Sequence, residues 1–176
     1  MNKKAFLKSI PAVAGSIYIS FILETSIFSL LALGGIRPNI LLIVTAMFGF
    51  MMGPKYGMVT GFFSGLVMDL FLGSYFGMYA LIFLYLGLLN GLFARMFYGD
   101  DIKLPLFLIA GSDILFGLVI YGTMFFLQGD RDTQFYLLNV IIPEAVYTTV
   151  VALLAYYPMK RLTEWINREE KRGTRR

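Results

Sequence analysis

Apolar residues follow one another along most of this chain in long runs that are separated by short polar breaks. Runs of about 18 or more apolar residues with few charges are typical of transmembrane helices. Helices of a soluble domain would each carry a polar face, and most of these runs do not. The pattern predicts an all-α integral membrane protein, a bundle of six transmembrane helices over residues 8–33, 40–52, 56–72, 78–97, 104–127 and 135–157.

Turn and cap residues mark the ends of several of these helices. Asn39 precedes the second run and is a suitable N-cap, and Gly53-Pro54-Lys55 turns the chain before the third. The second helix is short, about 20 Å by helical rise. Little tilt, local thinning of the bilayer, or partial burial among the other helices would each accommodate that length. Pro143 predicts a kink in the sixth helix.

The chain divides into residues 1–158, a single six-helix membrane domain, and residues 159–176, a basic tail. Leu162, Trp165 and Ile166 share one face if the start of the tail is helical, with basic residues around them. That pattern predicts a short interfacial helix followed by a disordered basic end in the cytoplasm.

Charge sets the expected orientation of the bundle. Lysines and arginines gather at the N-terminus, at Lys55, at the loop between Arg95 and Lys103, and in the tail. The opposite side receives only two cations, Arg37 and Arg131. The positive-inside rule then places both termini in the cytoplasm. The net charge of +4 is explained by this topology and by contact with anionic lipid, and not by nucleic-acid binding.

A stripe of small residues follows the third helix. Gly53, Gly57, Gly61 and Gly65 recur every fourth residue, and Asp69 takes the next place. Residues four apart lie on one helical face, and small residues there let another backbone approach closely in a membrane. The stripe therefore packs against another helix of this chain or receives a foreign helix. For Asp69, structural hydrogen bonding or ion pairing, partner binding, and transport or catalysis are all open.

Four acids lie within the apolar runs, namely Glu24, Asp69, Asp113 and Glu144. A charged side chain at the centre of a membrane helix costs about 2.5–3.5 kcal/mol on insertion scales, so these acids are expected to avoid lipid. We predict that Glu24, Asp69 and Arg37 form one polar cluster that joins the first and third helices to the first loop. Asp113 and Glu144 are either buried structural groups or part of a ligand or partner site.

Several classes of chemistry find no support in the residues. The chain has no Cys and no His, which excludes disulfides, thiol chemistry and zinc sites built from sulfur or imidazole. No acid spacing resembles a compact metal motif, and the glycines lack the closing Lys-Ser/Thr of a phosphate-binding loop. We therefore expect no catalytic residues, no metal and no cofactor, and an intramembrane enzyme is disfavoured.

The sequence resembles the MreD family of bacterial rod-shape-determining membrane proteins. The specific part of the match is the block from Arg37 to Leu81. The matching residues in this block are Arg37-Pro38-Asn39-Ile40-Leu41-Leu42, Gly57, Gly61-Phe62, Gly65-Leu66, Asp69, Gly77 and Ala80-Leu81. Near the end of the chain, Pro143 and Tyr147-Thr148 also fit the family.

The resemblance implies a non-enzymatic scaffold of the elongasome, multi-pass in the bacterial cytoplasmic membrane. It implies binding to MreC, a single-span protein, and support of the peptidoglycan glycosyltransferase and transpeptidase of side-wall synthesis, with MreB acting indirectly. The implied fold resembles the substrate-binding subunits of energy-coupling-factor transporters. The alternative function is a vitamin-binding subunit of such a transporter, in which Asp113, Glu144 and Asn90 would line the pocket. In the scaffold, a foreign helix would dock on the groove formed by Gly57, Gly61 and Gly65.

Overall fold

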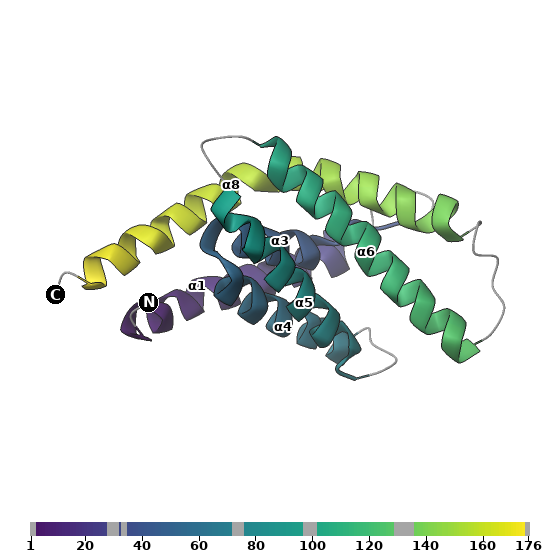
Figure 1. Cartoon of the computed structure of the whole chain (residues 1–176), viewed down its shortest axis with the longest axis horizontal. Helices are drawn as coiled ribbons and strands as arrows, with labels where there is room; N and C mark the ends of the chain where they lie inside the picture. Colours follow the sequence, from purple (N-terminus) through teal and green to yellow (C-terminus); the bar gives the residue numbers. More distant parts are fainter. Residues whose placement is uncertain are drawn as a thin grey trace.

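The computed structural model of the chain describes residues 3–27, 32, 35–71, 76–96, 102–128 and 136–174, and these residues form a helical bundle (Figure 1). The α-helices of this part number six, as predicted, and they are α1 (Lys3–Ile22), α3 (Ile40–Met52), α4 (Pro54–Phe71), α5 (Met78–Leu92), α6 (Lys103–Gln128) and α8 (Ile142–Thr174). The predicted bounds of α3 are confirmed. Arg131, one of the two cations expected on the side opposite the termini, lies outside the described residues.

Helix α3 is the centre of the bundle. Every residue from Ile40 to Phe50 is buried, and α3 contacts each of the other five α-helices of the described chain. A helix that is apolar on all faces is expected to be buried, and α3 is surrounded by the other helices. Its short length is therefore accommodated by burial among its neighbours.

Helices α3, α4 and α5 form the most closely packed part of the molecule. Gly53 ends α3 with a positive φ of 97°, and Pro54 starts α4 directly after it. Proline is favoured in a first helical turn because its missing N–H has no partner there in any case. The resulting tight turn sets α4 against α3, and α5 packs along α4.

Two helices begin or end in a π-helical turn. Leu23–Ile27 follows α1, and Leu137–Ile141 precedes α8. In the second turn the backbone N–H of Ile142 donates to the carbonyl of Leu137, five residues back. Pro143 cannot donate to the carbonyl four residues before it and its ring crowds that carbonyl, which explains the widened turn at this place. The irregularity predicted from Pro143 is therefore a π turn at the start of α8.

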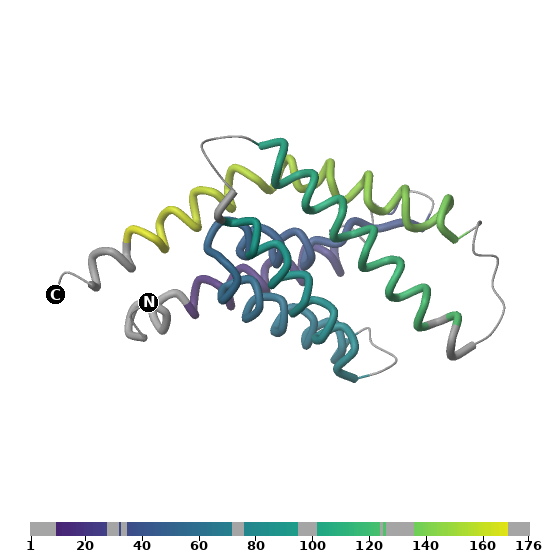
Figure 2. Tube along the Cα trace, in the orientation of Figure 1, coloured from purple at the N-terminus to yellow at the C-terminus, as the bar shows by residue number. Residues whose placement is uncertain are grey.

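Helix α8 corrects the predicted tail. The sequence analysis ended the sixth helix at Tyr157 and placed a separate short helix and a disordered end after it. One helix instead runs through Pro158 to Thr174, and Figure 2 traces it past Pro158. Thr163 and Ile166 are buried, and the Thr163 hydroxyl lies 3.3 Å from the sulfur of Met51, so this part of α8 packs on α3 past the predicted boundary.

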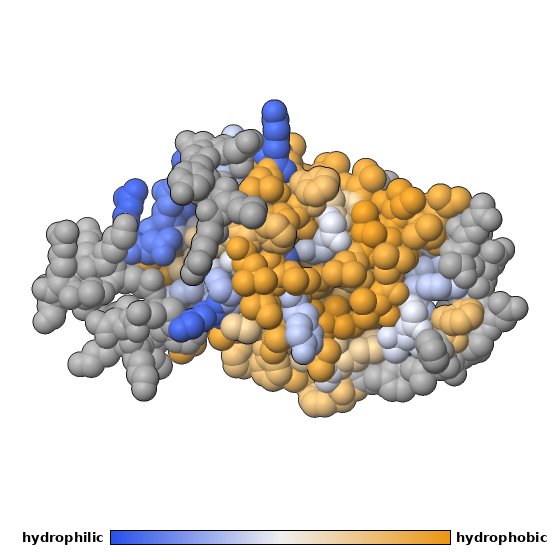
Figure 3. Space-filling model, in the orientation of Figure 1, coloured by the Kyte–Doolittle hydropathy of each residue, from blue (hydrophilic) through white to orange (hydrophobic). Residues whose placement is uncertain are grey.

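Three helices of the described chain are long and apolar enough to cross a membrane, over Ile10–Ile27, Lys103–Thr123 and Leu137–Arg168. The apolar helices α3 and α5 are shorter. Figure 3 shows apolar side chains across the middle of the visible face. The strongly hydrophilic described side chains gather toward the end where α1 begins and α8 ends (Figures 1 and 3).

Candidate functional site

Asp69 caps a helix to which it does not belong. It lies near the end of α4, and its two carboxylate oxygens accept hydrogen bonds from the backbone N–H groups of Tyr79 at 3.0 Å and Ala80 at 2.9 Å. These are the second and third residues of α5, and the N-cap position itself is Gly77, which has no side chain to offer. A carboxylate at a helix N-terminus satisfies free N–H groups and interacts favourably with the helix dipole. Asp69 is therefore a structural link between α4 and α5.

Glu24 likewise caps the N-terminus of α3, a helix to which it does not belong. Its Oε2 accepts a hydrogen bond from the backbone N–H of Leu41 at 3.0 Å, and Glu24 is buried. The predicted N-cap is confirmed, because the side chain of Asn39 accepts from the N–H of Leu42 at 3.0 Å. Glu24 sits in the π turn Leu23–Ile27, and such turns often reposition a side chain for a specific contact. Two acceptors from two segments thus satisfy adjacent donors at the start of the central helix.

Other buried polar groups also join helix to helix. The N–H of Asn39 donates to the hydroxyl of Thr148 on α8 at 3.1 Å. The Nδ2 of Asn90 on α5 donates to the hydroxyl of Ser112 on α6 at 2.7 Å and to the carbonyl of Leu86 at 2.8 Å. In an apolar environment each of these bonds satisfies groups that would otherwise be costly to bury.

The predicted cluster of Glu24, Asp69 and Arg37 is only partly right. Arg37 is near enough to Glu24 for a minor electrostatic contribution, smaller than those of the backbone N–H groups of α3, and its side chain is exposed. Asp69 is not in this group, because the free N–H groups of α5 satisfy both of its oxygens. The sequence showed the acid at the end of the stripe, but not which helix terminus it would meet.

Asp113 and Glu144 lie in the same region of the bundle as Glu24. Asp113 on α6 and Glu144 on α8 are both near enough to Glu24, in the π turn after α1, for the three carboxyl groups to interact electrostatically. Asp113 is 3% exposed, and it lies beside Thr148. Within the described chain, neither Asp113 oxygen meets the geometry of a hydrogen bond. No group of three or more acidic residues in this part of the chain is arranged to hold a metal ion.

The glycine stripe is filled by α5. A Cβ added at Gly57 would clash with the carbonyl of Gly87, one at Gly61 with the carbonyl of Phe83, and one at Gly65 with the carbonyl of Tyr79. Of the two uses left open by the sequence, the structure shows packing within the chain. The groove expected to receive a foreign helix is thus occupied by the neighbouring helix, and a partner has to meet another surface.

The sequence analysis missed Ser112 and the pairing of Thr148 with Asn39. Both partners are hydroxyl residues on long apolar helices, where a small hydroxyl also bonds readily to its own backbone. Thr148 was noted only as part of the family resemblance. The signal that could have found Ser112 is its position next to Asp113, on the face that an intramembrane acid must turn toward protein.

One comparison with known proteins identifies the family. The sequence model of MreD, described as rod shape-determining protein MreD, matches residues 8–166. The chain belongs to the MreD family. No curated protein and no solved structure matches it. As a member of this family of structural membrane proteins, the MreD chain has a role in rod-shape determination.

Proposed function

We propose that this MreD protein is a non-enzymatic scaffold of the elongasome that binds an MreC-like membrane protein. Through that partner it supports the peptidoglycan glycosyltransferase and transpeptidase of the side wall and, indirectly, MreB. The family match over residues 8–166 is the single observation that carries this proposal. The protein lies in the bacterial cytoplasmic membrane with both termini in the cytoplasm.

The internal links of the bundle suit a scaffold. Glu24 and Asp69 hold the starts of α3 and α5, and Asn90 bonds to Ser112 between α5 and α6. These contacts use polar groups to fix helix against helix, so recognition of a partner falls to the outer faces of the bundle. A rigid core with an apolar exterior is what a protein needs in order to present a constant surface to other membrane proteins.

The vitamin-transporter alternative has no observation in its favour. Asn90, one of its expected pocket residues, is buried and bonded to Ser112, and Asp113 is buried against α8. The likeness in fold to the energy-coupling-factor subunits stays a prediction.

Depletion in the native rod-shaped bacterium tests the proposal. Cells that lose this protein should widen and become spherical while vitamin uptake is unchanged, and expression of the full chain from a second locus should restore rods. Cells that keep their rod shape after depletion would contradict the scaffold role.

A further inference from the structure

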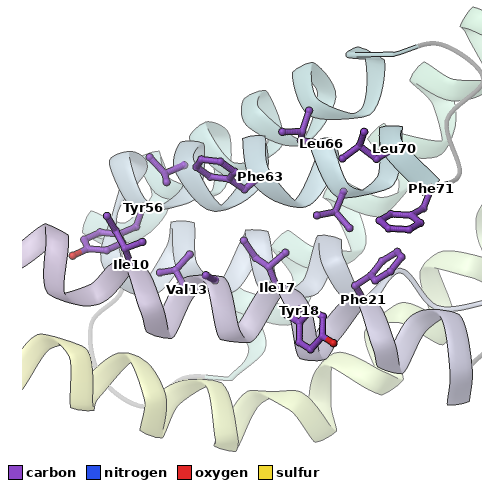
Figure 4. Close-up of a pocket in the computed structure, with 13 residues that line it drawn as sticks. Ile10, Val13, Ile17, Tyr18, Phe21, Tyr56, Phe63, Leu66, Leu70 and Phe71 are labelled. Atoms are coloured by element: carbon purple, nitrogen blue, oxygen red, sulfur yellow. The ribbon is translucent and has the colours of Figure 1, made fainter.

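A groove of 640 Å³ runs between α1 and α4 on the side of α4 away from the glycine stripe (Figure 4). Its walls are apolar side chains of α1 from Ile10 to Phe21 and of α4 from Tyr56 to Phe71. This volume is within the range of about 300–1,000 Å³ that is typical of small-molecule sites. None of the buried polar links described above lies among its lining residues.

The two ends of the groove differ. At one end Phe21 and Phe71 reach across from the two helices, and their ring centroids are 4.8 Å apart, so this end is closed (Figure 4). At the other end are Ile10 and Tyr56. The exposed Lys55 directly precedes Tyr56 on α4, so a positive charge stands one residue from the lining at this end of the groove.

The positive charge of Lys55 is not balanced by a nearby acid of α4. The first acidic residue of α4 is Asp69, four turns further along and bonded to α5. A basic site beside an apolar groove between membrane helices is complementary to an anionic lipid.

The length of the groove distinguishes a lipid from a helix. The eleven residue steps from Ile10 to Phe21 correspond to about 16 Å of helical rise. One leaflet of a hydrocarbon core about 30 Å thick contributes about 15 Å. A transmembrane helix would have to continue past the closed end, and helix seams in membranes are built from small residues, whereas bulky side chains such as Phe63, Leu66 and Leu70 line this groove.

We propose that the groove between α1 and α4 binds one acyl chain of an anionic phospholipid, with the phosphate of that lipid at Lys55. The chain enters at Ile10 and Tyr56, runs along α1 and α4, and ends against Phe21 and Phe71. The site would tie the start of α4 to the membrane surface. This inference is independent of the proposed partner.

Photo-crosslinking in vesicles tests the proposal directly. The full chain is placed in phosphatidylcholine vesicles that contain a trace of phosphatidylglycerol with a diazirine in one acyl chain, and cross-linked peptides are mapped by mass spectrometry. Cross-links should concentrate in residues 10–21 and 56–71. Phosphatidylglycerol should label these residues about fivefold more than the matching phosphatidylcholine probe, the factor expected for one lysine near the surface.

Two variants with matched controls separate the groove from its charge. Ala14→Phe fills the groove and should abolish the local cross-links, whereas Ile19→Phe, on a 59% exposed position of the same helix outside the groove, should keep them. Lys55→Gln should reduce the preference for phosphatidylglycerol at residues 10–21 and 56–71, whereas Lys103→Gln at the exposed start of α6 should not. Because Lys55 is exposed, its variant tests the proposal even if Ala14→Phe does not fold.

Three outcomes would overturn the lipid site. Cross-links spread evenly over lipid-facing residues such as Phe107, which is 77% exposed, would show that the groove has no preferred ligand. Equal labelling by the two probes in the unmodified protein would remove the role of Lys55. Loss of a co-purified membrane protein in Ala14→Phe, with unchanged lipid cross-links, would assign the groove to a protein helix instead.

Discussion

At the residue scale, Asp69 and Glu24 each complete a helix that begins elsewhere in the chain. Both accept hydrogen bonds from backbone N–H groups in the first turn of a short apolar helix. An isolated charge in an apolar interior is expensive, but a carboxylate that meets two free donors at a helix N-terminus is compensated by them. The same arrangement explains how these acids are accommodated inside apolar runs.

Removal of the Asp69 carboxylate tests this account at one residue. Asp69→Ala leaves the buried N–H of Ala80 and the partly buried N–H of Tyr79 without acceptors, so we expect a loss of unfolding free energy of about 1–3 kcal/mol for the buried group and less for the other. Asp69→Asn keeps one acceptor oxygen, so its unfolding free energy should fall by less. Unfolding in detergent, followed by the far-ultraviolet circular dichroism signal, measures both.

Glu164→Ala is the matched control for that experiment. Glu164 is exposed on α8 and lies 3.9 Å from Arg168, so its loss should change stability by less than about 1 kcal/mol. Equal stability of Asp69→Ala and Glu164→Ala would contradict the capping role of Asp69.

At the element scale, the α4 and α5 pair depends on the absence of side chains. Gly57, Gly61 and Gly65 each face a backbone carbonyl of α5 where a methyl group does not fit. Close approach of this kind is how helices associate in a membrane, where the hydrophobic effect does not drive them together. The spacing in the sequence was therefore enough to predict a contact stripe.

Single alanine substitutions test that packing. Gly61→Ala places a Cβ against the carbonyl of Phe83, so α4 and α5 must separate and the stability of the bundle should fall. Gly111→Ala is the control, because a Cβ added there meets nothing within 4 Å and alanine favours the helix. Thermal stability in detergent should decrease for Gly61→Ala and stay level or rise for Gly111→Ala; the reverse order would show that the stripe is not packed.

How far the sequence predicted this structure depends on the range of each interaction. Local signals were reliable, since Asn39 is the N-cap of α3 and the bounds of α3 are those expected from its apolar run. The partners of Asp69 were not predictable, because they are set by how α5 returns along α4. The helix end predicted at Tyr157 was wrong: α8 continues through Pro158, and buried residues beyond it such as Thr163 and Ile166 pack inside the bundle, which the local sequence does not show.

At the scale of the whole molecule, the orientation of the protein in the membrane is predicted only from the distribution of its lysines and arginines. The start of α1 and the end of α8 lie at the same end of the bundle (Figure 1). Lys55 lies in the first turn of α4, and Lys103 is the first residue of α6. We expect that end to face the cytoplasm, with Arg37 toward the opposite side.

Cysteine labelling measures this orientation without background, because the chain contains no cysteine. A cysteine in place of Lys55 should be protected from a membrane-impermeant thiol reagent in intact spheroplasts and labelled after lysis. A cysteine in place of the exposed Arg37 should be labelled before lysis. The opposite pattern would invert the topology.

The scaffold role is tested most directly by what the protein binds in its own membrane. The tagged full chain should be purified in mild detergent from the native rod-shaped cells, beside an unrelated tagged multi-pass protein as control, and the co-purified proteins identified by mass spectrometry. We predict that a single-span MreC-like protein is enriched with the MreD chain and absent from the control. Recovery of a transporter ATPase with a bound vitamin, and no MreC-like protein, would contradict the account.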